Sequence, residues 1–241
     1  MSLSDIRTRI ADNVNRSDIP DTNGGLIDRW INDAQRQICR SYNFAFMETE
    51  TQTTTTEDQT SYSIPDGTGT TLRFKSEISL ELIEPASSDR KLLKKTSKQD
   101  AERAFRTNKS GRPIQYAIQQ KAIFFYPTPS GNSGNDWTIN IEYYGYLDDL
   151  SADIDTNDLV DDFPEALEYL GTALALRYAM EEERAEFWEN KFKQFLSGMV
   201  QEVDQDRNGT QELGMRPEPG AGTFPQPIQS DLNDNSIFWY Y

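Results

Sequence analysis

The sequence predicts an α+β fold: a helical bundle built from N- and C-terminal helices, with an inserted antiparallel β lobe and an extended C-terminal tail. Apolar residues recur at helical spacing near both ends, whereas β-branched and aromatic residues alternate through the middle. The last 35 residues hold four Pro and four Gly without periodicity. The predicted parts are N-terminal helices at 1–47, a β lobe with one helix at 48–147, an acidic linker and C-terminal helices at 148–206, and the tail at 207–241.

Two helices are predicted in the first of these parts. Leu3, Ile6, Ile10 and Val14 are spaced by three or four residues, which places them on one face of a helix over 3–15. Ser2 or Ser4 precedes this stripe as a capping residue. The second helix ends near residue 42 and carries a longer apolar stripe of Leu26, Ile27, Trp30, Ile31, Ala34 and Ile38.

From residue 48 the sequence pattern changes from the spacing typical of helices to the alternation typical of strands. Residues 48–65 are rich in Thr and polar on both faces, which predicts an exposed hairpin. Residues 71–85 predict a half-buried strand with a bulge near Ser76. Its apolar face is formed by Leu72, Phe74, Ile78, Leu80 and Leu82. Ser97 is placed to cap a short helix, and three further strands are predicted within 111–147.

Two aromatic runs within 122–147 flank a segment of Pro, Ser, Gly and Asn, which predicts a hairpin with a mobile tip at 130–135. Alternation places Phe124 and Tyr126 on one face and Phe125 on the other. Such strands are typical of a sugar-binding platform or of a lobe core with subunit contacts. The second interpretation is favoured, because one set of side chains must fill the lobe.

The C-terminal helices follow an acidic linker that holds seven Asp and no basic residue between positions 147 and 162. Pro164 starts the first helix, as the first turn allows. This helix also carries small residues, which permit a close helix neighbour: Ala166, Gly171, Ala173 and Ala175. The last helix is predicted over 182–204 from the spacing of Trp188, Phe192, Phe195, Met199 and Val203.

The composition excludes several common classes of catalytic site. The chain has no His and one Cys, so His-based acid–base catalysis, a catalytic triad with His, an intrachain disulfide and a thiolate metal cluster are excluded. Asp153, Asp155 and Asn157 resemble the start of a calcium loop, but position six is Asp158 rather than Gly and position twelve is Pro164 rather than Glu. We therefore expect no catalytic residue, no metal and no cofactor.

The net charge of −16 is unfavourable for a protein that grips nucleic acid, because phosphate binding needs a basic surface. The N-terminus has no apolar signal region, and no apolar run reaches membrane-spanning length. We expect the protein to be synthesised in the cytoplasm and not to associate with a membrane.

Several runs resemble the head–tail adaptor (connector) proteins of tailed bacteriophages, in the same order along the chain. They are LIDRWINDAQRQICRSYNFAFME, SYSIPDG, SGRPIQYAI with KAIFFYPTP, INIEYYGYLDDLSADIDTNDL, and FPEALEYLGTALALRYAMEEERAEFWENKF. The quoted runs lie between residues 26 and 192, and the resemblance as a whole is spread over residues 1–205. The long C-terminal tail departs from the family pattern.

The resemblance implies a structural role in the virion, at the head–tail junction, without catalysis. Such adaptors form a ring, usually dodecameric, under the portal protein; the ring continues the DNA channel and provides the attachment surface for tail (nozzle or tube) proteins. DNA would pass through without specific binding. The alternative is a carbohydrate-binding or other tail-associated β module.

Two sets of contact residues are predicted. Small and aromatic residues of helices 25–42 and 163–205 are assigned to subunit packing: Trp30, Ala34, Ala166, Leu170, Ala173, Leu174, Trp188 and Phe192. The tail ends in five large apolar or aromatic residues, which are typical interface anchors and are assigned to docking on the portal or a neighbour: Ile237, Phe238, Trp239, Tyr240 and Tyr241.

Overall fold

The computed structural model describes residues 1–208 except 17, 20, 21, 23, 69, 70, 85–88, 108 and 131–136, with side chains to residue 202. The chain divides into two units, Met1–Asp204 and Gln205–Tyr241. Residues 209–241 lie outside the described part, so the extended tail stays a prediction.

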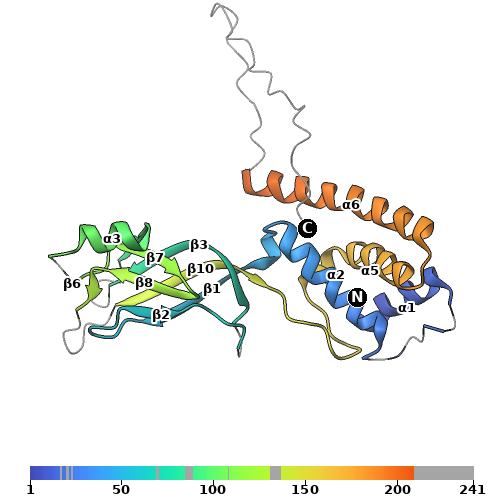
Figure 1. Ribbon diagram of the computed structural model, residues 1–241, viewed down its shortest axis with the longest axis horizontal. Helices are drawn as coiled ribbons and strands as arrows, with labels where there is room; N and C mark the ends of the chain where they lie inside the picture. The colour runs from blue at the N-terminus through green and yellow to red at the C-terminus, as the bar shows by residue number, and fades with distance from the viewer. Residues whose placement is uncertain are drawn as a thin grey trace, which may run out of the picture. The chain divides into compact units, whose positions relative to one another are not determined.

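The described chain is mixed α and β, as predicted, with six α-helices and mainly antiparallel sheets (Figure 1). The helices are α1 (Leu3–Val14), α2 (Leu26–Ser41), α3 (Lys98–Ala104), α4 (Asp158–Asp162), α5 (Pro164–Tyr178) and α6 (Glu182–Asn208), and a 3-10 turn spans Ala45–Met47. The capping serine of α1 is Ser2, and the backbone N–H of Asp100 donates to the Ser97 hydroxyl at the start of α3. Helix α4, in the acidic linker, was not predicted.

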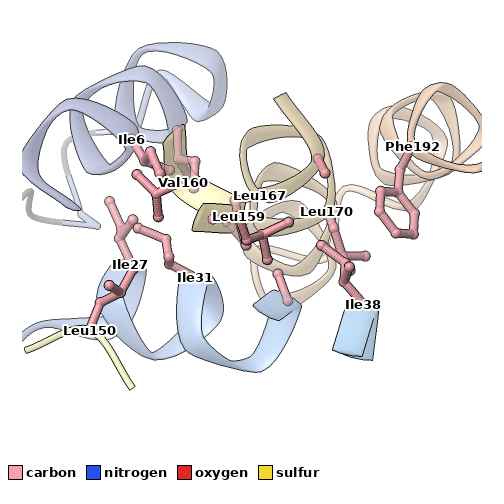
Figure 2. Close-up of a cluster of buried hydrophobic side chains, with 14 of the residues drawn as sticks. Ile6, Ile27, Ile31, Ile38, Leu150, Leu159, Val160, Leu167, Leu170 and Phe192 are labelled. Atoms are coloured by element: carbon pink, nitrogen blue, oxygen red, sulfur yellow. The ribbon is translucent and has the colours of Figure 1, made fainter. Parts of the chain in front are cut away.

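One hydrophobic core joins helices from both ends of the chain. Figure 2 shows side chains of α1, α2, α5 and α6 pointing toward one another, together with those of the linker. The shared residues include Ile6, Ile31, Leu159, Leu167 and Phe192. Helix α5 packs against both α1 and α2, so the N-terminal helices bury their apolar stripes on a segment more than 100 residues later in the chain.

The strands form two four-stranded sheets and one two-stranded pair. Their bounds are β1 (Glu48–Thr54), β2 (Ser61–Ser63), β3 (Arg73–Ile83), β4 (Arg90–Leu92), β5 (Lys94–Lys95), β6 (Ser110–Gly111), β7 (Gln115–Gln119), β8 (Ala122–Tyr126), β9 (Thr128–Pro129) and β10 (Thr138–Tyr146). The orders are β1-β10-β3-β4, β2-β8-β7-β5 and β6-β9. The β5–β7 and β6–β9 pairings are parallel, so the antiparallel prediction holds only for the others.

A second core lies between the two larger sheets. It contains Leu80 and Leu82 of β3, Ile141 of β10, and Tyr116 and Phe125 of the other sheet. Helix α3 covers part of β7 and β8. The aromatic strands thus pack inside the lobe, as the favoured interpretation expects.

Both predicted hairpins are wrong. β1 pairs with β10 rather than with β2, and β2 belongs to the other sheet, where it pairs with β8. β8 and β10 also lie in different sheets, so they do not form a hairpin with each other. The predicted tip at 130–135 lies, apart from residue 130, outside the described residues. Consecutive strands do pair antiparallel elsewhere in the lobe, where β3 pairs with β4 and β7 pairs with β8.

Strand β3 carries two irregularities in its pairing with β10, near the predicted bulge. The register steps from Ser79 to Glu77 and from Ser76 to Phe74, leaving Ile78 and Lys75 without opposite residues. Ile78 is therefore 41% exposed, although alternation predicts it in the core.

The same bulged strand connects the lobe to the helices. The ammonium group of Lys75 donates hydrogen bonds of 2.5 Å to the carbonyl oxygens of Cys39 and Tyr42. A cation at the C-terminal end of α2 satisfies carbonyls that have no partner within the helix and complements the helix dipole. Burial lowers the pKa of Lys75, and burial raises the pKa of the Cys39 thiol.

A buried ion pair ties α1 to α2. Arg7 Nε and Nη2 donate to the two oxygens of Asp28 at 2.6 and 3.0 Å, and both side chains are 6% exposed. Arg7 Nη1 also lies 2.7 Å from Asp153 of the acidic linker. The hydrogen bond to Asp28 is the first cause of a raised pKa of Arg7, which stays charged.

We predict that Arg7→Ala lowers the free energy of unfolding by about 3 kcal/mol, because it leaves the Asp28 carboxylate buried without its cation. Urea denaturation followed by circular dichroism measures this loss. Arg9→Ala is the matched control: Arg9 is also paired with a carboxylate but is 46% exposed, so its loss costs less than about 1 kcal/mol. Equal losses in both variants would contradict the assigned role of the Arg7 pair.

Candidate functional site

Most residues assigned to subunit packing lie inside the single chain. Five of the eight are buried, with exposed fractions of 8% or less: Ala34, Ala166, Leu170, Ala173 and Phe192. These five side chains pack within the single chain, and their role in subunit packing stays a prediction. A bulky substitution such as Ala173→Trp would disturb the chain's own packing first.

The small residues of α5 have a neighbour within the chain. A Cβ built on Gly171 would lie 2.6 Å from Cδ1 of Ile10, so α1 approaches α5 too closely for a larger side chain. The sequence pattern correctly indicated a close helix neighbour. The neighbour in the structure is α1 of the same chain, whereas the prediction placed another subunit there.

The other three residues of that set remain partly exposed. Trp30, Leu174 and Trp188 are half-buried and pack on the outside of the helical core. The ring of Trp30 lies 5.4 Å from that of Tyr178, between ring centroids. Their role in subunit packing stays a prediction.

Sequence reasoning missed the most exposed apolar group on the helices, the α5–α6 corner, defined as Tyr178, Met180 and Phe187. Their exposed fractions are 61%, 85% and 63%. These three large side chains lie within ten positions of one another in the sequence. Large apolar side chains that are exposed at neighbouring positions of the chain mark a candidate interaction site.

The backbone and ion pairs hold this corner in place. Met180 N–H donates to the carbonyl of Arg177 at 3.0 Å, and Glu181 N–H donates to that of Leu176 at 2.9 Å. This is a Schellman motif, in which Met180 takes the left-handed position with φ of 62°. Glycine usually fills that position, so no sequence signal marked the turn. Glu181 is paired with Arg16 at 3.2 Å and with Arg184 at 2.5 Å.

Aromatic rings support the outer face of α6 next to the corner. The Trp188 ring lies 5.8 Å from Phe187 and 5.7 Å from Tyr169 of α5, between centroids. The ammonium of Lys191 lies 4.2 Å from the Tyr169 ring and 4.7 Å from the Trp188 ring. These contacts fix Trp188 and Tyr169, whereas Phe187, which touches the Trp188 ring, remains 63% exposed.

The acidic linker has structural roles at the positions that resemble a calcium loop. Asp153 pairs with Arg7, and Asn157 accepts from Val160 N–H to cap α4. Asp155 accepts from the backbone N–H groups of Ala152 and Ser151, which lower its pKa in that order of effect. No group of three or more candidate metal ligands occurs in the described part of the chain.

No described helix is both long enough and apolar enough to span a bilayer. The five docking residues assigned to the tail, Ile237–Tyr241, lie outside the described residues, and their role stays a prediction.

The sequence model of the family described as SU10 adaptor protein matches residues 1–216. No curated protein matches the chain. The family match includes every described helix and strand and most of the 241 residues. The resemblance inferred from the ordered motifs is thereby confirmed, and the chain belongs to the SU10 adaptor protein family, a family of phage head–tail adaptors.

Proposed function

We propose that this protein is a structural head-to-tail adaptor that forms a ring, dodecameric by the family resemblance, under the portal protein of a tailed bacteriophage. The ring continues the DNA channel and provides the attachment surface for tail (nozzle or tube) proteins. The observation that carries the proposal is the family match over residues 1–216. We further propose that the protein acts at the head–tail junction of the virion, without catalysis or a cofactor.

The exposed α5–α6 corner supports a protein-binding role on the helices. Complete burial of one large apolar side chain contributes about 1.5–3 kcal/mol. Tyr178, Met180 and Phe187 together therefore offer several kcal/mol to a partner that covers them. We assign this corner to the contact with a neighbouring subunit or with the portal.

The alternative, a carbohydrate-binding module, is less well supported by the lobe. Phe125 and Tyr143 are buried, and Tyr126 stacks on Phe105 with ring centroids 6.5 Å apart. The ammonium of Lys98 lies 3.9 Å from the centroid of the Phe124 ring. A sugar platform needs exposed, coplanar rings, whereas these four already have partners within the chain.

We predict that Phe187→Ser combined with Met180→Ser prevents stable ring assembly on purified portal, because it removes two exposed apolar contacts. The melting temperature should change by less than about 2 °C, since both side chains are mostly outside the core. Mass photometry of portal mixed with adaptor measures the number of bound subunits. Ile78→Ser, at a 41% exposed position on the lobe, is the control. Normal rings from the double variant would exclude the corner as a contact.

The tail generates a separate prediction. Deleting residues 229–241 removes the cluster Ile237–Tyr241 and should leave the melting temperature nearly unchanged while abolishing stable attachment to portal-containing heads. Differential scanning calorimetry and co-sedimentation with heads measure the two effects. Normal head–tail joining would show that the tail is not the anchor, and a markedly lower melting temperature would show that the cluster belongs to the protein's own core.

A further inference from the structure

The basic residues of this acidic protein are concentrated in one segment. Residues 90–112, called here the basic segment, contain nine Lys or Arg and two acidic residues, a net charge of +7. The whole chain has a net charge of −16, so the residues outside this segment carry a net charge of −23. A charge separation of this size favours contact with an acidic surface.

The basic segment lies along one edge of the lobe. It includes β4, the last strand of one sheet, and β5, the last strand of the other, followed by α3 and β6. Lysines on edge strands commonly prevent strand-to-strand aggregation. That role accounts for the charges on β4 and β5, but it does not account for Arg103, Arg106 and Lys109 beyond them.

Part of this charge is not neutralised within the chain. Lys91 and Arg112 share Glu84 at 3.7 and 2.6 Å, and Arg90 lies 3.3 Å from Glu81. In contrast, no carboxylate of the described residues forms an ion pair with any of three exposed cations, which are Lys94, Arg106 and Lys109.

Exposed apolar side chains accompany these cations. Leu92 on β4 is 70% exposed, between Lys91 and the buried Leu93. Ile114 is 52% exposed, and its carbonyl accepts from the Lys94 N–H at 3.1 Å. A DNA backbone offers phosphates and no apolar group at such a surface, so the combination fits an acidic protein surface with an apolar residue on it.

The same chain presents a surface of that kind in its acidic linker. Ile154 is 85% exposed and is flanked in the sequence by Asp153 and Asp155. Asp158 and Asp162 lie one helical turn apart on α4, and both are exposed. No ion pair joins the linker to the basic segment within the described part of one chain.

The linker is held rigidly against the helices. The backbone N–H groups of Leu3 and Ser4 donate to the carbonyls of Asp155 and Asp153 at 3.0 and 3.1 Å. The Asn32 side chain makes two hydrogen bonds with the backbone of Leu150, at 2.9 and 2.8 Å. The linker therefore presents its acidic residues and Ile154 in a fixed arrangement.

We infer that the basic segment of one copy binds the acidic linker of a second copy, with Ile154 meeting the exposed Leu92 and Ile114. This inference rests on the proposed ring and names the surfaces through which neighbouring subunits touch. The contact joins two different surfaces, so each subunit offers one of them to each of its two neighbours.

Reciprocal charge reversal tests the inference with the full-length chain, alone and with the portal. The first variant carries Lys94→Glu, Arg106→Glu and Lys109→Glu, at positions without intrachain ion pairs. The second carries Asp158→Lys and Asp162→Lys. Each alone should weaken self-association at least tenfold in sedimentation velocity and on the portal, whereas a mixture of the two should associate again, because opposite charges then face each other.

The matched control is Lys121→Glu, which makes the same charge change on the lobe at an exposed position outside the basic segment. Lys121→Glu should weaken self-association much less than Lys94→Glu alone. If neither charge-reversal variant weakens ring formation, or if mixing the two variants does not restore association, the inference is overturned and the proposed ring still stands. A wild-type chain that never associates, with or without the portal, would overturn both. Loss of binding to a short DNA duplex in the first variant would overturn the inference in favour of a DNA site.

Discussion

The helical part of this protein depends on one buried cation. Arg7 binds Asp28 through two of its nitrogens and Asp153 through the third, so it joins α1, α2 and the acidic linker at a single point. Arg7 and Asp28 are both buried, and burial of these two charges is tolerable because they neutralise each other through two hydrogen bonds, whereas the Asp153 side chain is 52% exposed. The linker held by this pair also donates Leu150, Leu159 and Val160 to the helical core. The ion pair between Arg7 and Asp153 thus helps to place the apolar residues of the linker in the helical core.

Five of the six described helices, all except α4, could be predicted from the sequence because their signals are local. The capping residues Ser2 and Ser97, Pro164 in the first turn of α5, and the stripes at three- and four-residue spacing are all signals that depend on residues within a few turns. Several strand pairings could not be predicted, because the partner lies far away in the sequence: β1 reaches β10 across more than 80 residues. The β7–β8 hairpin turns through Gln120 and Lys121 with φ of 52° and 60°, where Asn-Gly would be the usual signal.

The contact surfaces were harder to predict than the fold, for a physical reason. A stripe of small residues indicates a close neighbour but does not say which one, and here Gly171 meets Ile10 of its own chain. Met180 was missed because a large residue at a left-handed position carries no sequence signal. The basic residues of 90–112 are visible in the sequence, but the net charge of −16 does not reveal them, because a sum of charges does not show where along the chain each sign is concentrated.

The separation of charge bears on which assemblies the chain can form. A contact between a basic surface and a different, acidic surface is heterologous, so it cannot close as a twofold dimer unless both surfaces meet twice at once. Repeated around an axis, such contacts give a closed ring or an open filament, depending on the rotation between subunits. Each contact need only be weak, because closing a ring lets the last subunit make two contacts at once and raises its effective concentration. An adaptor that assembles on a portal would gain from contacts of this strength, since individual subunits could exchange until the ring is complete.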